Sequence, residues 1–268
     1  IAARTRVMAP RGEARDEGDP VLEVAVRMGL ANKLPVSNYE ELLDYRLEPL
    51  GMTFAEFSAA GIFERANEPA KHEKGKIRKD GKPGFNTASG KIEFASAKLA
   101  AFGYDPLPDF VEPPDSPYSA PQLAEDYPLV LISGTRSIEY YSTMGIEIPR
   151  LRSRRPWPTL EMSPLTAACF GLEEGDWVSV ETPNSPRAIK RQVALMAGMD
   201  ERVVNAEGLW YMPGCEDLIE GVLEANSNVL TPLRDDVDPV CGGSVARCLI
   251  CRIAKCEPPE AARRDHAA

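Results

Sequence analysis

Three phrases between residues 127 and 178 decide the fold. They are Tyr127-Pro-Leu-Val-Leu-Ile-Ser-Gly-Thr-Arg136, Glu161-Met-Ser-Pro164 and Ala167-Ala-Cys-Phe-Gly-Leu-Glu-Glu-Gly-Asp-Trp-Val178. The first is a continuous apolar run, typical of a strand buried on both faces, and it ends in a glycine turn with a cation. The second predicts a junction between a strand and a short helix that has Ser163 as its N-cap. Because the third adds a tight turn and an alternating strand, we expect many short strands in a closed β-barrel.

The rest of the chain predicts further strands after this region and helices before it. Strands are expected at residues 129–132, 177–181, 188–195, 202–205 and 247–253. Upstream, apolar residues at helical spacing predict three helices, which begin after Asp19, after Ser37 or Asn38, and after Thr53. Thr87 to Phe94 is expected to form a turn that enters an alternating strand. Six prolines between residues 106 and 121 exclude a sustained helix or a central strand there, so this stretch is a predicted linker.

The order of the three phrases resembles the C-terminal dinucleotide-binding domain of the molybdopterin oxidoreductases, the dimethyl sulfoxide reductase family. Thr87-Ala-Ser-Gly-Lys-Ile-Glu93 and the closing Arg247-Cys-Leu-Ile-Cys-Arg-Ile253 are similar to two further phrases of that family. The resemblance covers nearly the whole chain, from residue 19 to residue 255. It implies an α+β chain that is mainly a six-stranded double-psi β-barrel, preceded by a partial, helix-rich α/β segment.

Four parts of the chain are expected on this basis. Residues 1–110 are a partial, helix-rich segment of the preceding domain of the catalytic subunit, and residues 111–122 are the proline-rich linker. Residues 123–256 are the molybdopterin dinucleotide-binding barrel, and residues 257–268 are a disordered tail. The chain opens without Met, so a fragment of a longer enzyme is the simplest interpretation.

The function implied by the resemblance is that of the C-terminal cofactor-binding part of a molybdenum or tungsten bis-molybdopterin guanine dinucleotide oxidoreductase. Within the family the phrases lean to the thiosulfate/polysulfide reductase and acetylene hydratase relatives. The expected cofactor is molybdopterin guanine dinucleotide, and the metal ligand and an iron–sulfur cluster are expected in the N-terminal half. The expected partners are that half and an iron–sulfur electron-transfer subunit, so the isolated chain is expected to be inactive.

The candidate cofactor-binding residues centre on the glycine turn after the first strand. Glycine there lets backbone N–H groups approach an anion, and the planar fork of Arg136 suits a phosphate. Trp210 falls where relatives carry His-Gly-Trp-Trp, with Glu207 in place of the histidine. The full predicted set is Ser133, Gly134, Thr135, Arg136, Ser137, Tyr141, Ser142, Glu161, Ser163, Trp210, Asn226, Asn228 and Arg247.

Several of these residues have a structural alternative. Glu161 can accept hydrogen bonds from guanine N–H groups, whereas Ser163 either contacts guanine or only caps a helix. Asn226 and Asn228 either satisfy the donors and acceptors of a pterin or form an Asx turn in a loop. The chain contributes no catalytic side chain and no metal ligand on this interpretation.

The net charge and the distribution of apolar residues limit the classes of partner that the chain is expected to bind. The net charge is −10, from 41 acidic and 31 basic residues, so nucleic acid is not an expected partner. No apolar run approaches the roughly 18 residues of a membrane span, so direct membrane insertion is not expected. Residues 1–15 do not have the pattern of a secretory signal. The compartment, cytoplasmic or periplasmic, stays open.

The cysteines offer a competing interpretation. Cys241, Cys248, Cys251 and Cys256 are dense enough to suggest a zinc or iron–sulfur site. In a strand, however, Cys248 and Cys251 would point to opposite faces, so free thiols are expected. Two alternative functions remain: a stand-alone dinucleotide-binding barrel subunit that acts in trans, and a cysteine–metal binding module without pterin.

Overall fold

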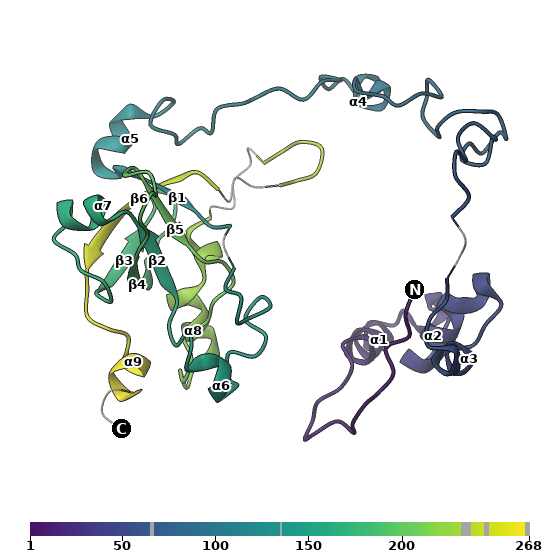
Figure 1. Ribbon diagram of the computed structural model, residues 1–268, viewed down its shortest axis with the longest axis horizontal. Coiled ribbons are helices and arrows are strands. Elements are labelled where there is room, and N and C mark those ends of the chain that lie inside the picture. The colour runs from purple at the N-terminus through teal and green to yellow at the C-terminus, as the bar shows by residue number, and fades with distance from the viewer. Residues whose placement is uncertain (65–66, 135, 232–236, 244–246, 266–268) are drawn as a thin grey trace. The chain divides into compact units, whose positions relative to one another are not determined.

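The computed structural model describes residues 1–64, 67–134, 136–231, 237–243 and 247–265. The chain divides into two compact units, Ile1–Pro108 and Asp109–Ala268. Short helices make up the first unit, and a β-barrel dominates the second (Figure 1). The division lies at the start of the proline-rich stretch.

The first unit consists of short helices joined by turns. Its elements are α1 (Gly18–Arg27), η1 (Ala31–Lys33), α2 (Tyr39–Leu47), η2 (Glu48–Leu50), α3 (Phe54–Ala60) and α4 (Ala97–Ala101). Asn38 caps α2 by accepting a hydrogen bond from the Glu41 N–H, and Thr53 and Glu56 form a capping box on α3. Both predicted helix starts are therefore confirmed.

Two local predictions in the first unit are wrong. Asp19 is not the N-cap of α1 but lies in its first turn, and the cap position is held by Glu17, whose side chain makes no capping bond. Residues 87–94 form turns and bends rather than a strand. The reason is local, because the Thr87 hydroxyl donates to the Lys91 carbonyl over 2.6 Å and folds the chain back on itself.

The first unit covers little apolar surface. Its buried hydrophobic side chains are Leu22, Leu47 and Phe57, one from each of the three main helices. Many apolar side chains in the same part of the chain are exposed, among them Val21, Val24, Val26, Met28, Phe94 and Phe102. Among its described residues, the first unit therefore lacks the large covered core that stabilises a domain of this length.

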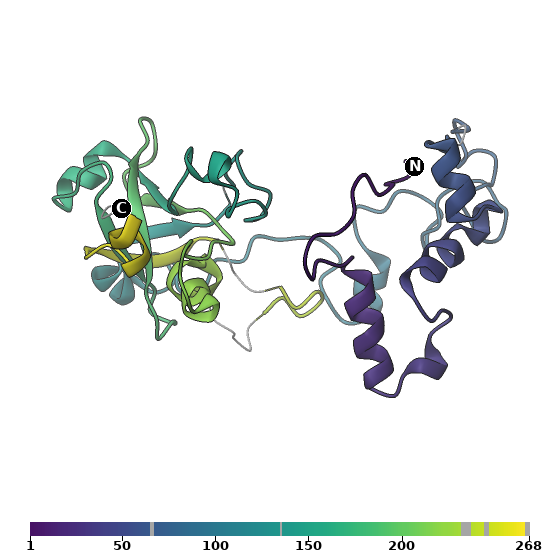
Figure 2. The same ribbon diagram turned by 90° about the horizontal axis from the view of Figure 1, so that it is seen from below.

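The second unit forms a closed barrel. Among the described residues its strands are β1 (Leu129–Ile132), β2 (Thr159–Met162), β3 (Trp177–Glu181), β4 (Ile189–Leu195), β5 (Val203–Ala206) and β6 (Leu249–Lys255). They close in the order β1-β5-β2-β4-β3-β6. Figure 1 and Figure 2 show the barrel unit from two directions. The β1/β5 and β2/β4 pairs are parallel and the other pairs are antiparallel. The predicted fold class, α+β with a closed six-stranded barrel, is confirmed.

Side chains that alternate along the strands fill the barrel. Leu131, Leu160, Val178 and Val204 are almost completely buried and belong to one cluster with the other inward-facing residues. The predicted strand at residues 247–253 begins later than expected, at Leu249. Its expected start is interrupted because Cys248 has a φ of 62°, a left-handed conformation that ends extended pairing.

Helices surround the barrel in the second unit. They are α5 (Pro121–Asp126), α6 (Pro149–Arg152), α7 (Pro164–Cys169), α8 (Leu218–Ala225), η3 (Ser227–Leu230) and α9 (Glu260–Asp265). Ser163 caps α7, as predicted, by accepting from the Thr166 N–H over 2.9 Å. None of the helices described in either unit has the length and apolar character that crossing a membrane requires.

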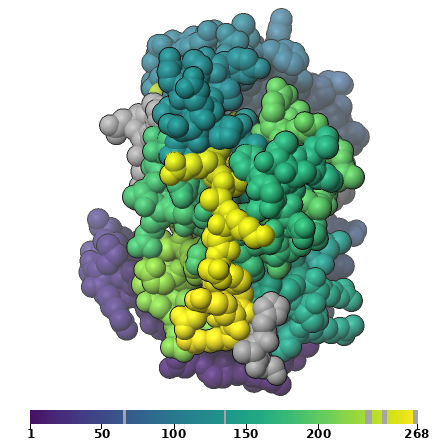
Figure 3. All heavy atoms as spheres, turned by 90° about the vertical axis from the view of Figure 1, so that its left-hand side faces the viewer, coloured from purple at the N-terminus to yellow at the C-terminus, as the bar shows by residue number. Residues whose placement is uncertain are grey.

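The C-terminal segment corrects a prediction. Residues 257–268 were expected to be disordered, but α9 occupies residues 260–265. Ala262 is completely buried in a second apolar cluster, which also contains Trp157, Trp177 and Trp210. Figure 3 shows this C-terminal segment, in yellow, along one face of the barrel unit. The helix forms because packing against the tryptophan cluster supplies stability that a short polar helix lacks by itself.

Candidate functional site

The loops that follow β1 and β5 meet at one end of the barrel. These two strands run in parallel, so their carboxyl ends open at the same edge, where ligands bind in many sheets with parallel strands. A Cβ on Gly208 would lie 3.6 Å from the Ser133 carbonyl oxygen and 3.7 Å from the Ser227 Oγ. A Cβ on Gly134 would lie 3.9 Å from the Arg247 guanidinium. Segments far apart in the sequence therefore converge here, and we call these five residues, with the loops that carry them, the β1/β5 rim.

This convergence places the two main candidate segments together. Ser133 and Ser227 both lie beside Gly208, as expected for the turn after β1 and the segment 226–231. The Asn226 side chain accepts from the Asn228 N–H over 2.9 Å, which is the Asx turn that the sequence left as an alternative. Asn228 is exposed at the start of η3.

Backbone strain gathers around the same rim. Among the described residues, five other than glycine have a positive φ, and four of them are Ser142, Thr143, Leu209 and Cys248. Leu209 and Cys248 directly follow Gly208 and Arg247, and Ser142 and Thr143 lie further along the loop after β1. Such conformations cost on the order of 1–3 kcal/mol each, and they cluster at sites where a ligand requires a particular loop shape.

Arg136 is the exposed cation of the loop after β1. Its Nη1 donates to the Ser142 Oγ over 2.8 Å, which links the loop to the strained turn at residues 142–143. Tyr141 is largely exposed beside this bond. The guanidinium has further N–H groups that can donate hydrogen bonds to a phosphate, because arginine carries five of them.

A buried carboxylate lies beneath the loop. Glu207 directly follows β5 and is 4% exposed. Its Oε1 accepts a hydrogen bond from the Ser137 N–H, and its Oε2 lies 3.0 Å from the Arg155 Nη2. A buried carboxylate is stable only when its charge is compensated, and here Arg155 supplies a cation.

Arg155 joins this carboxylate to Glu161 on β2. Its Nη2 also donates to the Thr159 Oγ1 over 2.7 Å and lies 3.9 Å from the Glu161 Oε1. Glu161 Oε2 accepts from the Asn205 Nδ2 over 2.7 Å. Glu161 is half-buried, and Arg155 and Asn205 together orient its carboxylate. It lies near the end of β2, where the sequence predicts a contact with guanine.

Arg191 is a second cation under the rim. It occupies an inward-facing position of β4 between Ile189 and Val193, and it is completely buried. Its Nη2 donates to the Glu207 carbonyl over 2.9 Å, while its Nε and Nη1 have no hydrogen-bond partner among the described residues. Burial lowers the pKa of the guanidinium to about 9, against the opposing effect of Glu207, so Arg191 remains a cation at neutral pH.

Sequence reasoning missed Glu207, Arg155 and Arg191 as parts of the site. A signal was present for Arg191, because a cation at the apolar positions of an alternating strand needs a reason to be there. Glu207 was noted only as a departure from the family phrase. Arg155 carried no signal for this role, since Glu207, the buried carboxylate that it compensates, lies 52 residues further along the chain.

Two residues of the predicted set have structural roles. Trp210 is 1% exposed and packs edge-on against Tyr140, with ring centroids 5.4 Å apart, so it belongs to the apolar core. The Ser163 hydroxyl is engaged with the Thr166 N–H and Oγ1, at 2.9 and 2.8 Å. It acts as a helix cap, which is the structural alternative that the sequence left open. Thr135, another predicted contact, lies outside the described residues.

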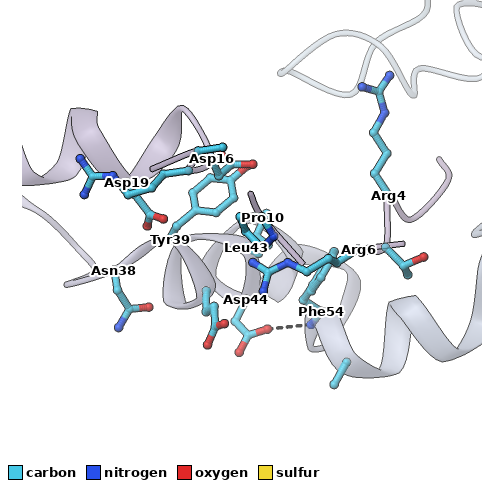
Figure 4. A pocket seen from close by; sticks show the side chains of 15 residues that line it. Arg4, Arg6, Pro10, Asp16, Asp19, Asn38, Tyr39, Leu43, Asp44 and Phe54 are labelled. Carbon is cyan, nitrogen blue, oxygen red and sulfur yellow. Dashed lines mark hydrogen bonds between the residues drawn. The ribbon is translucent and has the colours of Figure 1, made fainter. Parts of the chain in front are cut away.

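The first unit has an open cavity of about 900 Å³ lined by residues of α1, α2, α3 and the N-terminal segment. Figure 4 shows Arg4 and Arg6 on one side of it and Asp16, Asp19 and Tyr39 on the other. Its charges are mixed. The hydrogen bond drawn in Figure 4 runs from the Phe54 N–H to the Asp44 carboxylate and fixes the start of α3.

The cysteines do not converge on a metal. Cys251 is buried in the barrel core, and burial raises the pKa of its thiol to about 12. Cys248 lies outside the strand and is exposed. Within the described ranges, no three His, Cys, Asp or Glu side chains are grouped so that they could hold a metal ion. His72 stacks on Phe85 in the first unit, 5.0 Å between ring centroids.

Comparison with known proteins identifies the barrel region. Residues 129–248 match the family model of the molydopterin dinucleotide binding domain. The chain is 36% identical over 177 residues to acetylene hydratase from Syntrophotalea acetylenica, a match that covers 66% of this chain and 23% of that protein. It is 33% identical over 183 residues to dopamine dehydroxylase from Eggerthella lenta, covering 67% of this chain and 18% of that protein. The chain thus spans about a quarter or less of the length of these relatives.

A solved structure gives the same result. Acetylene hydratase from Pelobacter acetylenicus superimposes with a TM-score of 0.77 at 30% sequence identity. The match covers 94% of this chain and 34% of that structure, so it includes both units.

Proposed function

We propose that this chain, which belongs to the molybdopterin oxidoreductase (dimethyl sulfoxide reductase) family, is the C-terminal cofactor-binding part of a larger enzyme. Residues 129–248 are a molydopterin dinucleotide binding domain. In this proposal the cofactor is molybdopterin guanine dinucleotide with molybdenum or tungsten. The metal ligand and an iron–sulfur cluster lie in the N-terminal half of the same enzyme.

The observation that carries the proposal is the convergence of four segments on the β1/β5 rim. Arg136 and Arg247 are exposed there, and each can present N–H donors to a diphosphate. Glu161 is held by Asn205 with its carboxylate half-buried, which suits a purine that donates N–H groups. The residues of the chain bind and orient; the cofactor, when bound, supplies the metal at which the reaction takes place.

The side chains present fit such a ligand. Ser137 Oγ and Ser227 Oγ are buried, and neither has a hydrogen-bond partner in the described part of the chain. Buried polar groups are normally paired, so hydroxyls left without a partner at a rim indicate a ligand that completes them. Ser137 follows Arg136, which donates to the strained Ser142, and the Ser227 Oγ lies near Gly208, which precedes the strained Leu209.

Two reaction classes fit this proposal. One relative is named a hydratase and another a dehydroxylase, so we propose an oxidoreductase or a hydratase of this family. We favour the acetylene hydratase branch over the thiosulfate and polysulfide reductases because the 36% identity is with acetylene hydratase. The partner of the exposed apolar side chains of the first unit is, in this proposal, the N-terminal half of the enzyme.

Cofactor content tests the proposal directly. The full chain is purified from a host that makes pterin dinucleotides, and pterin is measured by its fluorescence after oxidation, with metal analysis in parallel. We expect pterin in the wild-type chain and a loss of most of it in the Arg136→Ala/Arg247→Ala double variant. Arg202→Ala is the matched control, because Arg202 pairs with Asp200 on the surface before β5, at the other end of that strand. Zinc without pterin would instead support the cysteine–metal alternative.

A further inference from the structure

Glu207 has an arrangement that a simple packing role does not require. The carboxylate is buried and contacts the backbone of a different loop through the Ser137 N–H. Taking a carboxylate out of water costs several kcal/mol, and an apolar residue of similar size fills such a space more cheaply. The bond to Ser137 is therefore the feature that needs an explanation.

The surrounding chain delivers this carboxylate to the loop. Gly208 follows immediately and lies against both Ser133 and Ser227. Leu209 comes next, with a φ of 63°, so the chain turns sharply as soon as it has placed Glu207 under the loop. The carboxylate thus reaches the loop from the end of β5, the strand that runs parallel to β1.

Two guanidinium groups hold Glu207 in place. Arg155 pairs with Oε2 at 3.0 Å, and Arg191 donates to the carbonyl oxygen at 2.9 Å. Arg155 also faces Glu161 from 3.9 Å. The two cations offset the charge of Glu207, so a buried anion can lie under the loop without making that loop repel phosphates.

We propose that Glu207 is a positioning residue that fixes the loop after β1, through the Ser137 N–H, in the shape that receives the phosphates of the dinucleotide. The ligand in this statement rests on the proposed function, whereas the effect on the loop does not. Glu207 does not touch the ligand; it acts through Ser137 and its neighbours Gly134 and Arg136.

Two substitutions in the full chain distinguish the effect of the reach of the Glu207 side chain from the effect of its charge. Glu207→Asp keeps the charge that Arg155 and Arg191 need but withdraws the carboxylate from Ser137 by one methylene. Glu207→Gln keeps the reach and an acceptor oxygen but removes the charge. Glu181→Asp is the matched control, because Glu181 pairs with Arg252, which lies over Tyr127 at the opposite end of β1.

Amide hydrogen exchange measures the loop, and guanosine diphosphate is the binding probe. In Glu207→Asp we expect the Ser137 amide to exchange about tenfold faster and the Kd of the probe to rise about tenfold, the scale of one lost charge-assisted hydrogen bond. The amides of β1 and β3 should be unchanged. In Glu207→Gln the Ser137 amide should stay protected while the melting temperature falls. Glu181→Asp should match the wild type in both measurements.

Other outcomes overturn the proposal. Wild-type exchange at Ser137 in Glu207→Asp would show that the carboxylate does not hold the loop. Loss of protection throughout the barrel in that variant would show that Glu207 supports the fold as a whole. If the wild-type chain fails to bind the probe, the proposed function is in error, and the exchange measurement still decides the role of Glu207.

Discussion

At the scale of the residue, location separates two pairs of arginines at the β1/β5 rim. Arg136 and Arg247 are exposed, whereas Arg155 and Arg191 lie beneath the loop and compensate Glu207. A guanidinium keeps its charge in both settings, so its surroundings decide what the charge does. The exposed pair remains available to an anion, and the inner pair is committed to the fold.

Arg136→Ala should lower cofactor retention more than any other single substitution of a rim side chain. The expected loss is one charge-assisted hydrogen bond, roughly 1.5–3 kcal/mol of binding free energy. Pterin content after dialysis measures the effect. The melting temperature of the apo chain should hardly change, because the side chain is exposed and its bond to Ser142 is a surface contact. A barrel that melts early with full pterin occupancy would make Arg136 a structural residue.

Cys251 should be inert to alkylation in the folded chain. Burial raises the pKa of its thiol to about 12, so the reactive thiolate is scarce at pH 8, and the core also blocks access. Cys169 and Cys248 are exposed and should be labelled by iodoacetamide within the same period. Peptide mass spectrometry before and after unfolding gives the comparison. Rapid labelling of Cys251 without denaturant would show that β6 opens readily.

At the scale of the element, the strands were predictable and their surroundings only in part. The runs at 129–132 and 177–181 coincide with β1 and β3. A strand that is buried on one face or on both needs an alternating or continuous pattern of apolar residues, and that pattern is visible in the sequence. The helix α9 was not predicted, because it is stabilised by the packing of Ala262 in a tryptophan cluster that distant segments form. Glu207 and Arg155 were missed for the same reason, because a non-local ion pair leaves no local pattern.

Asp176 should make the junction of β3 and β6 sensitive to acid. Lys255 Nζ lies 2.8 Å from its Oδ2, and this hydrogen bond, with one from the Glu173 N–H, lowers the pKa of Asp176. A lowered folded-state pKa gives stability that is present above the unfolded value of about 4 and is lost as pH falls through the folded value. The stability difference between wild type and Asp176→Asn should therefore shrink below pH 4. Urea melts at pH 7, 4 and 2.5 measure it, and a constant difference would contradict the prediction.

At the scale of the whole molecule, the two units differ in how well they cover their apolar side chains. The barrel has two buried clusters, whereas the first unit buries only three large apolar residues among those described. Exposed apolar side chains such as Val24, Met28 and Phe102 are expected to contact another surface in the proposed enzyme.

A dye that fluoresces in apolar surroundings should distinguish the units. The full chain is expected to bind more anilinonaphthalene sulfonate per mole than a piece with residues 109–268, because the exposed apolar side chains of the first unit add to those that the barrel unit also exposes, such as Phe110 and Leu218. The barrel piece should still melt cooperatively by circular dichroism. Equal dye fluorescence per mole would mean that the first unit covers its own apolar surface.

The position of β6 in the barrel sets the order of events during synthesis. Among the described residues it is the last strand, yet it lies between β1 and β3 and pairs with both. Until β6 has left the ribosome, β1 and β3 each keep an unpaired edge, which is the part of a sheet most prone to wrong pairing. The barrel can close only after translation has passed Lys255, so a shorter nascent chain has no finished rim to offer a ligand. A ligand can therefore be loaded only after β6 has been made and has paired, and chaperone protection of the early strands has to last until then.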